Sequence, residues 1–257
     1  MKRFLQFLAY LSYLYGTKDE HSVHSPFIFD LYTNAIIDRK SYYVFSNIES
    51  VRARLKLNTS RIRVTDYGTG RSRKRRIASI AASALKKPKG AELLFRLVNH
   101  FQPKHVLELG TSLGITSSYL ASVSSNINVW TLEGCPETAA IAQQTFDTLK
   151  LKNVRLTIGP FEDTLEKVLD EMPQLDFVFL DGNHRKAPTI QYFEACLEKT
   201  NDQSIIVVDD IHWSKEMEEA WLTIKSHSKV HVSIDLFEVG ILILNPKLEK
   251  QEYILRF

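Results

Sequence analysis

The sequence predicts an α/β fold in which a doubly wound sheet follows a mostly helical N-terminal region. Two observations carry this prediction. From residue 105 onward, short apolar runs alternate with helical patterns of about 10–15 residues, which is typical of βαβ units and a parallel sheet. The last two apolar runs are separated only by residues 236–238, too few for the crossover of about a dozen residues that a parallel pair needs. One strand near an edge of the sheet must therefore be reversed.

The second part of the chain supplies the predicted sheet and its helices. The predicted strands span residues 105–109, 128–132, 154–158, 175–180, 204–208, 230–235 and 239–244. The predicted helices span residues 115–123, 136–150, 161–171, 188–199 and 215–226. The helix over 136–150 shows the expected pattern, because Ala139, Ala142, Phe146 and Leu149 fall on one face.

The first hundred residues carry little strand signal. The predicted elements are helices at 3–15, 27–38, 48–56, 75–86 and 90–100, one short strand at 62–65, and turns at 21–26 and 66–70. We therefore expect a helical N-terminal region over residues 1–100, which is a candidate cap for an acceptor site. A sheet domain over residues 101–257 follows it.

Composition limits the class of protein. A chain of 257 residues that is 44% hydrophobic and 25% charged fits a globular protein and excludes a disordered or collagen-like one. Cys135 and Cys196 are too few for a disulfide scaffold, so we expect a reducing, cytoplasmic location. No uncharged run is apolar enough to cross a membrane. The apolar segment 4–15 precedes no signal-peptide cleavage site, so we expect an amphipathic aromatic helix there.

The net charge of +3 hides an uneven distribution. Residues 1–105 hold 20 Lys and Arg against 7 Asp and Glu, whereas residues 106–257 hold 13 against 23. The densest basic run is 71–76, with the sequence Arg-Ser-Arg-Lys-Arg-Arg. Because few aromatic residues interleave this run, we interpret it as a solvated helix face or a contact with the acidic part. The alternatives are contact with nucleic acid and binding of an anionic small substrate.

The most specific motif is residues 106–114, with the sequence Val-Leu-Glu-Leu-Gly-Thr-Ser-Leu-Gly. A buried strand carrying Glu108 ends at Gly110, and Gly114 opens a helix, so the backbone can turn tightly and approach a ligand closely. The dinucleotide fingerprint G-x-G-x-x-G is incomplete, because Ser112 replaces the glycine that admits a pyrophosphate. This departure favours a nucleoside ligand without a pyrophosphate over NAD.

Acids and glycines recur where the predicted strands end. Glu133 ends the second strand, 23 positions after Gly110, where an acid can bind both hydroxyls of a ribose. Gly159, Asp181 and Asp209 follow the next three strands. Ligands of open α/β sheets bind outside the carboxyl ends of the strands, so these residues are expected at one edge of the sheet.

Four segments carry a family resemblance: VLELGTSLGITSSYLA, LEGCP, LDFVFLDGNH and IIVVDDIHW. They resemble the class I S-adenosylmethionine (SAM)-dependent methyltransferases, in particular the catechol O-methyltransferase-like group, over roughly residues 100–245. The resemblance implies a seven-stranded Rossmann-like sheet with the last strand antiparallel, in agreement with the short connection described above. It also implies SAM as the methyl donor.

The resemblance further implies which residues bind the cofactor. Glu133 would bind the ribose, and Phe161 with Pro160 would contact the adenine ring. The implied cofactor-binding residues are Glu108, Gly110, Thr111, Ser112, Gly114, Glu133, Gly159, Pro160, Phe161 and Asp181.

The family's metal site uses one acid after the fourth strand and a pair after the fifth. Asp181, Asp209 and Asp210 stand in those places. Three carboxylates would suit Mg²⁺, which could hold two substrate oxygens and lower the pKa of the one to be methylated. The alternative is that Asp181 positions SAM, while Asp209 and Asp210 cap the following helix.

The family's catalytic lysine lies three residues after the fourth-strand acid, but this chain has His184 there. Histidine can remove a proton near neutral pH, so His184 and Asp181 are the candidate catalytic residues. The alternative is a histidine that only hydrogen-bonds the substrate or a neighbouring acid. His212, three residues after Asp209, is a second candidate base.

Together these observations predict a SAM-dependent methyltransferase that methylates an oxygen of a small-molecule acceptor. One alternative is an RNA or DNA methyltransferase that uses the basic N-terminal region, although no Asn/Asp-Pro-Pro-aromatic tetrapeptide follows the fourth strand. The other alternative is a SAM-binding module without catalysis. No membrane partner is expected, and the oligomeric state is left open.

Overall fold

The structure is a computed structural model that describes residues 10–11, 13–17, 23–66 and 71–257. The chain forms two compact units. The central unit is the continuous segment Asp38–Met172, and the discontinuous unit combines Met1–Ile37 with Pro173–Phe257. Each unit is described by itself below.

Three parallel strands form the sheet of the central unit. They are β3 (His105–Leu109), β4 (Asn128–Glu133) and β5 (Val154–Ile158), and β4 pairs with both of the others. The strands β3 and β4 are almost wholly buried, as expected for parallel strands covered on both faces. The predicted strands over 105–109, 128–132 and 154–158 are thereby confirmed.

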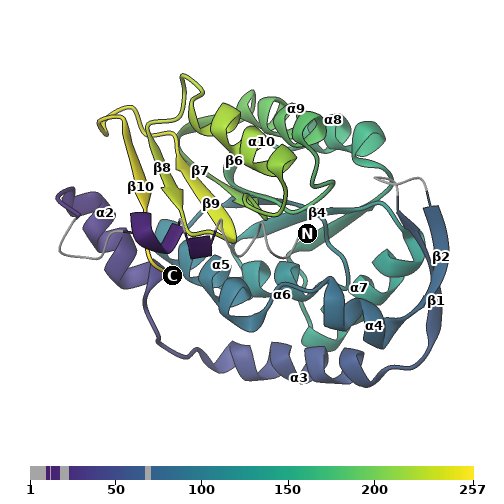
Figure 1. The fold of residues 1–257 in the computed structure, drawn as a ribbon. Helices are drawn as coiled ribbons and strands as arrows, with labels where there is room; N and C mark the ends of the chain where they lie inside the picture. Colours follow the sequence, from purple (N-terminus) through teal and green to yellow (C-terminus); the bar gives the residue numbers. More distant parts are fainter. Residues whose placement is uncertain (1–9, 12, 18–22, 67–70) are drawn as a thin grey trace. The chain divides into compact units, whose positions relative to one another are not determined.

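Three helices follow these strands: α6 (Ile115–Ala121), α7 (Pro136–Leu149) and α8 (Phe161–Glu171). Both α7 and α8 contact β4, and Figure 1 shows them on opposite sides of this strand. The predicted apolar face of α7 is found, since Ala139, Ala142 and Phe146 are buried. The central unit is therefore built from βα repeats, as the sequence predicts.

The rest of the central unit precedes β3. It consists of α3 (Tyr43–Leu57), the antiparallel hairpin of β1 (Arg61–Asp66) and β2 (Arg71–Arg76), α4 (Ile77–Ser83) and α5 (Pro88–Phe101). The helices predicted at 48–56 and 90–100 are found with longer bounds. The prediction of a helix over 75–86 is wrong at its start, because residues 71–76 form a strand. The basic run is therefore not a helix face.

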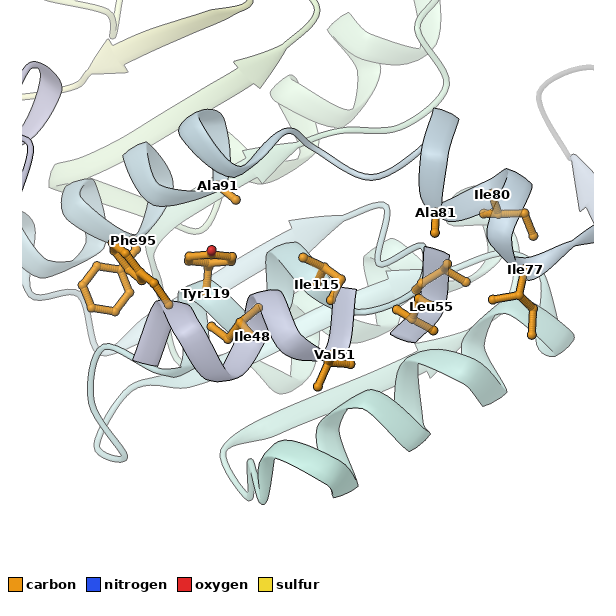
Figure 2. Close-up of a cluster of buried hydrophobic side chains, with 12 residues drawn as sticks. Ile48, Val51, Leu55, Ile77, Ile80, Ala81, Ala91, Phe95, Ile115 and Tyr119 are labelled. Carbon is orange, nitrogen blue, oxygen red and sulfur yellow. The ribbon is translucent and has the colours of Figure 1, made fainter. Parts of the chain in front are cut away.

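A buried cluster joins α3, α4, α5 and α6, and Figure 2 shows Phe95 and Tyr119 at one end of it and Ile77 and Ile80 at the other. Tyr119 is fully buried, and its hydroxyl donates a hydrogen bond to Glu49 Oε1 at 2.8 Å. Ile62 and Val64 of β1 pack against the same cluster. This packing attaches the β1–β2 hairpin to the helical part of the central unit.

The discontinuous unit holds the remaining strands. They are β6 (Leu175–Leu180), β7 (Thr200–Asp209), β8 (Val232–Asp235), β9 (Val239–Ile243) and β10 (Gln251–Ile254). Their spatial order is β10-β8-β9-β7-β6. β9 runs antiparallel to both β7 and β8, while β6 pairs with β7 and β10 pairs with β8 in parallel. The predicted reversed strand is thereby confirmed as β9.

All seven predicted strands are found, and β10 is a further strand that was not expected. Gln251–Ile254 is short and mostly exposed, and no apolar run in the sequence indicates a strand there. Tertiary contacts hold the end of the chain instead. Tyr13 donates a hydrogen bond to the carbonyl of Leu255, and Tyr32 donates one to the carbonyl of Arg256 at 2.9 Å.

Helices α9 (Lys186–Leu197) and α10 (Lys215–Lys225) follow β6 and β7 and contact one another. The N-terminal segment adds helical residues at 10–11 and 13–16, α2 (Pro26–Leu31) and the π-helical turn η2 (Tyr32–Ile36). These agree with the helices predicted at 3–15 and 27–38, although residues 3–9 and 12 of the first lie outside the described part. Of the turn predicted at 21–26, residues 23–25 are described and are not helical, while α2 begins at Pro26. The turn predicted at 66–70 lies outside the described part except for Asp66. A functional division at residue 100 stays a prediction.

Among the described residues, no helix combines the length and apolar character needed to span a bilayer. Cys135 and Cys196 are both buried and free.

The packing of α10 on β9 depends on the small size of Gly240. A β-carbon there would lie 2.5 Å from two ring atoms of Trp221, which is buried. We expect Gly240→Ala to lower the free energy of unfolding by about 1–3 kcal/mol, because the rigid indole must shift. Urea denaturation measures this effect.

Gly90→Ala is the matched control for Gly240→Ala. A β-carbon at this helical position would meet only the flexible side chain of Lys86. Alanine favours helix by up to about 1 kcal/mol over glycine, so this variant should be as stable as wild type or more stable. Equal losses in the two variants would show that the Trp221 contact does not decide the effect.

Candidate functional site

Backbone strain gathers where strands end. Among the described residues, six other than glycine have positive φ, and two of them, Gln102 and Lys150, are helix C-caps. The other four follow strand ends or connect two strands: Ser112, Asn183, Asp210 and Phe237. Such conformations cost about 1–3 kcal/mol each and cluster at functional sites. The loops after β3, β6, β7 and β8 are therefore candidates for a functional site.

In the central unit, Glu133 at the end of β4 is hydrogen-bonded to two neighbouring loops. Its Oε2 accepts a hydrogen bond from the backbone N–H of Ser112 at 2.9 Å, and its Oε1 accepts one from the N–H of Cys135 at 2.8 Å. Burial raises the pKa of Glu133, while these two N–H groups act to lower it. The carboxylate is therefore fixed in orientation, and each oxygen keeps a lone pair for a further donor.

The loop after β3 is tied to the end of β4. The N–H groups of Gly110 and Thr111 both donate to the carbonyl of Leu132, at 3.0 and 3.1 Å. The hydroxyls of Thr111 and Thr131 lie 2.6 Å apart. Gly110 has a φ of 108°, which favours glycine strongly. The predicted turn thus brings Gly110, Ser112 and Glu133 together.

Gly114 has a packing role that the sequence did not reveal. Its φ is 81°, and a β-carbon there would lie 2.8 Å from Phe146 Cε1 and 3.1 Å from Ala142 Cα. The glycine therefore lets the start of α6 approach α7. Its expected contact with the cofactor stays a prediction.

Glu108 lies deeper than the other predicted residues and is wholly buried. Its Oε2 accepts hydrogen bonds from Ser117 and from Thr131, while its buried Oε1 has no partner within the described residues. Burial raises the pKa of Glu108 to about 7, although the bonds from Ser117 and Thr131 act to lower it. A buried acceptor that lacks a donor needs a ligand, a water or a proton.

The end of β5 completes this side of the central unit. The N–H of Gly159 donates to the carbonyl of Glu133 at 3.0 Å, and Pro160 caps α8 ahead of the partly buried Phe161. Ile158, which pairs in register with Glu133, is 51% exposed. This exposure of Ile158 was not expected from the sequence, because an isoleucine in a strand is typically buried.

The discontinuous unit brings Asp181, His184 and Asp210 together. His184 Nε2 lies 3.7 Å from Asp181 Oδ1 and 3.9 Å from Asp210 Oδ2, within ion-pair range of both carboxylates. All three side chains are partly exposed. The N–H of Asp210 donates to the carbonyl of Glu238 at 2.7 Å, which fixes the loop after β7.

Asp209 stands apart from this group because it is 5% exposed and lies within β7, in register with Val239. Within the described stretches, no group of three or more His, Cys, Asp or Glu residues is arranged to hold a metal ion. The predicted Mg²⁺ site on Asp181, Asp209 and Asp210 is therefore not supported. The spacing of the acids places them after neighbouring strands, but it does not make their side chains converge.

His212, the second candidate base, is held in another arrangement. Its Nε2 lies 2.7 Å from Asp235 Oδ2, and its Nδ1 lies 3.5 Å from Glu218 Oε1. Burial acts to lower the pKa of His212, but the hydrogen bonds and charges of Asp235 and Glu218 outweigh it and leave the pKa raised. A histidine that keeps its proton more strongly is a poor base. This arrangement disfavours His212 in that role.

His212 lies at one end of a group of aromatic side chains that was not expected from the sequence. His212 stacks on Phe237 with ring centroids 5.2 Å apart, and Phe237 contacts Tyr10 and Tyr13 of the N-terminal helix at 4.9 and 5.3 Å. The sequence offered no signal for it, since Tyr10 and Tyr13 precede Phe237 by more than 220 positions.

The buried Glu108 generates a prediction about pH. The folded protein keeps a proton on Glu108 up to about pH 7, whereas the unfolded chain loses it near the ordinary value of 4.5. The folded state thus binds more protons between these values, so stability falls as pH rises from about 5 to 7 and then levels off. A shift of this size corresponds to about 3 kcal/mol.

Glu108→Gln cannot titrate and should lose this part of the pH dependence. Urea denaturation at several pH values measures it, with the exposed Glu171→Gln as the control that keeps the wild-type profile. A wild-type profile in Glu108→Gln would contradict the assignment.

Known proteins resemble the part of the chain that contains these strand ends. Residues 107–211 match a family model described as a methyltransferase domain. A catechol O-methyltransferase from Niastella koreensis is 31% identical over 127 residues, which cover 48% of this chain and 57% of that protein. The O-methyltransferase imqG from Aspergillus flavus is 28% identical over 42% of this chain and 45% of that protein. The chain thus spans about half the length of the curated relatives it matches.

Solved structures share the fold over a longer part of the chain. An O-methyltransferase from Bacillus cereus in complex with SAH covers 84% of this chain and 97% of its own, with 19% identity and a TM-score of 0.58. TomG, an O-methyltransferase from Streptomyces achromogenes in complex with SAM, covers 84% of this chain and 95% of its own, with 18% identity and a TM-score of 0.58. Residues 107–211 are therefore similar to a methyltransferase domain, and the chain shares the fold of these O-methyltransferase structures, in agreement with the resemblance found in its sequence.

Proposed function

We propose that this protein is a SAM-dependent methyltransferase that transfers a methyl group to an oxygen of a small-molecule acceptor. One observation carries the proposal above the others. The Glu133 carboxylate is held by the N–H groups of Ser112 and Cys135, at the tip of β4 beside the glycine turn after β3. An acid fixed in this way is suited to the two hydroxyls of a ribose.

The residues of the central unit fit a SAM molecule in three further respects. Glu108 Oε1 is a buried acceptor that has no donor among the described residues, and it could accept a hydrogen bond from the cofactor's ammonium group. Ile158 and Phe161 offer apolar surface at the end of β5, which suits an adenine ring. Ser112, in place of a glycine, fits a ligand without a pyrophosphate.

The bound cofactor would supply an activated methyl group on a sulfonium, so the protein need not activate the donor. The residues around it would mainly position the reactants and exclude water, and such alignment accounts for much of the rate enhancement in bimolecular reactions. If the acceptor is a hydroxyl, a base must also remove its proton.

We propose His184 as this base and Asp181 as the residue that orients it. In its neutral form His184 can accept a proton, and the resulting positive charge would be stabilised by Asp181 and Asp210 within 4 Å. Asp181 remains in addition a candidate contact for SAM. No step is assigned to a metal ion.

The two buried, free cysteines support the proposal of a reducing, cytoplasmic location. A SAM-binding module without catalysis is the competing function. Such a module would need the cofactor-binding residues around Glu133 but no base. The test of His184 below therefore separates this function from methyl transfer.

Glu133→Gln tests the cofactor site. The amide would present an NH₂ group to one of the two backbone N–H donors, which disturbs the loop and removes an acceptor for the ribose. We expect the dissociation constant for SAM to rise by at least about 10-fold, the equivalent of about 1.4 kcal/mol. Isothermal titration calorimetry measures it, with the exposed Glu171→Gln as control. Unchanged affinity in Glu133→Gln would refute the assignment.

His184→Gln tests the base. We expect the rate of S-adenosylhomocysteine formation on a panel of catechols and other phenols to fall by about 100-fold or more, with nearly unchanged SAM affinity. His227→Gln, which alters a histidine on the loop after α10, should keep wild-type turnover. Equal turnover in His184→Gln and wild type would exclude His184 as the base. Binding of SAM without turnover on any acceptor would favour the non-catalytic module.

A further inference from the structure

The hairpin of β1 and β2 places like charges opposite one another. Its register pairs Arg61 with Arg76 and Arg63 with Lys74, so two cations face each other twice on neighbouring strands. Directly opposite side chains have their β-carbons about 5 Å apart, and like charges in such pairs destabilise a sheet. Something in the structure must offset this repulsion.

The alternation of side chains gives the hairpin two different faces. Ile62 and Val64 of β1 are partly buried against the hydrophobic cluster of the central unit. The intervening residues therefore point the other way, toward solvent. This outward face, called the cationic face below, consists of Arg61, Arg63, Thr65, Ser72, Lys74 and Arg76.

The four cations of the cationic face are exposed. In the described part of the chain, no carboxylate lies within ion-pair distance of any of them. The sequence adds to this picture, since residues 67–91 contain no Asp or Glu at all. Among the side chains that the structure describes, the positive charge of this face is thus not neutralised by an ion pair.

The hairpin is held in place from its other side and from its edge. The backbone N–H of Arg63 donates to Glu137 Oε2 at 2.7 Å, the N–H of Thr65 donates to Cys135 Sγ at 3.4 Å, and that thiol donates to the carbonyl of Arg63. On the inward face, Arg75 donates hydrogen bonds to Ser79 and Ser83 of α4. These bonds and the burial of Ile62 and Val64 offset the repulsion, so the cations stay aligned without a counter-ion.

We propose that the cationic face binds the phosphodiester backbone of a nucleic acid. Arginine forms paired hydrogen bonds with phosphate, and alternate residues of a strand lie about 7 Å apart, so the face offers a regular array of phosphate contacts. The hydroxyls of Thr65 and Ser72, 3.2 Å apart, extend this array with neutral donors. A two-stranded ribbon is also narrow enough to enter the major groove of a duplex.

The composition of the face separates this partner from two others. Protein interfaces are built around buried apolar and aromatic anchors, and membrane-surface segments insert apolar side chains, but the cationic face contains neither. The lack of aromatic residues also means that bases do not stack on it. Binding is therefore insensitive to sequence and depends on charge.

The proposal does not depend on the proposed methyl transfer, since it concerns binding alone. We would measure fluorescence anisotropy of a labelled 20-base-pair DNA duplex and a labelled 20-nucleotide RNA strand between 50 and 200 mM salt. Four phosphate contacts predict a slope of log K against log salt of about −3.6 for the duplex and about −2.8 for the single strand. The two probes show which nucleic acid is preferred.

Arg63→Gln/Lys74→Gln removes one facing pair. We expect its affinity for the preferred probe to fall about 10-fold or more at 50 mM salt, and its salt slope to become shallower by about 2. The control Arg54→Gln/Lys56→Gln removes the same charge from exposed positions of α3 and should keep wild-type affinity within about 2-fold. The melting temperature of Arg63→Gln/Lys74→Gln should not fall, because the change relieves repulsion.

Three results would overturn the proposal. The first is that wild type fails to bind either probe at 50 mM salt. The second is that the Arg63→Gln/Lys74→Gln and control variants bind equally. The third is that polyglutamate or phosphatidylserine vesicles bind at least as tightly as the nucleic acids, which would assign the face to an acidic protein or a membrane.

Discussion

The carboxylate of Glu133 organises the ligand-facing part of the central unit. It accepts hydrogen bonds from the backbone N–H groups of Ser112 and Cys135, and so connects the turn after β3 to the loop after β4. Neither loop has regular hydrogen bonding of its own at these positions, so a single side chain supplies what both backbones need. The Cys135 thiol then continues the connection to the backbone of β1. The side chain that we propose to bind the ribose thus also connects three segments of the central unit.

The sequence predicted the buried strands well because their signal is local. β3 and β6 are found at the expected residues, since parallel strands covered on both faces appear as continuous apolar runs. β5 is also found at the expected residues, although none of them is buried. β9 was expected to be reversed because three residues cannot form a crossover. Once the ends of the strands are known, the residues of the loops that follow them are known as well. Gly110 and Glu133 could therefore be identified together.

The misses share one cause, which is that tertiary contacts decided the outcome. Residues 71–76 have no apolar alternation, and they form a strand because β1 is anchored by Ile62 and Val64 and offers them a partner. β10 depends on pairing with β8 in the same way. The ion pairs of His212 with Asp235 and Glu218 could not be foreseen, and neither could the burial of Asp209. Position along a sheet edge is encoded locally, but the orientation of a side chain is not.

The course of the chain through the discontinuous unit has a consequence for its synthesis on the ribosome. Tyr13 and Tyr32 bind backbone carbonyls that lie 242 and 224 positions later in the sequence. The helical residues around Tyr13 and Tyr32 must therefore wait, without these partners, until Leu255 and Arg256 have been translated. The central unit is continuous and can assemble while later residues are still being added, since domains generally fold as units during synthesis. The residues that follow β10 thus complete a unit whose first contacts were offered more than 200 positions earlier.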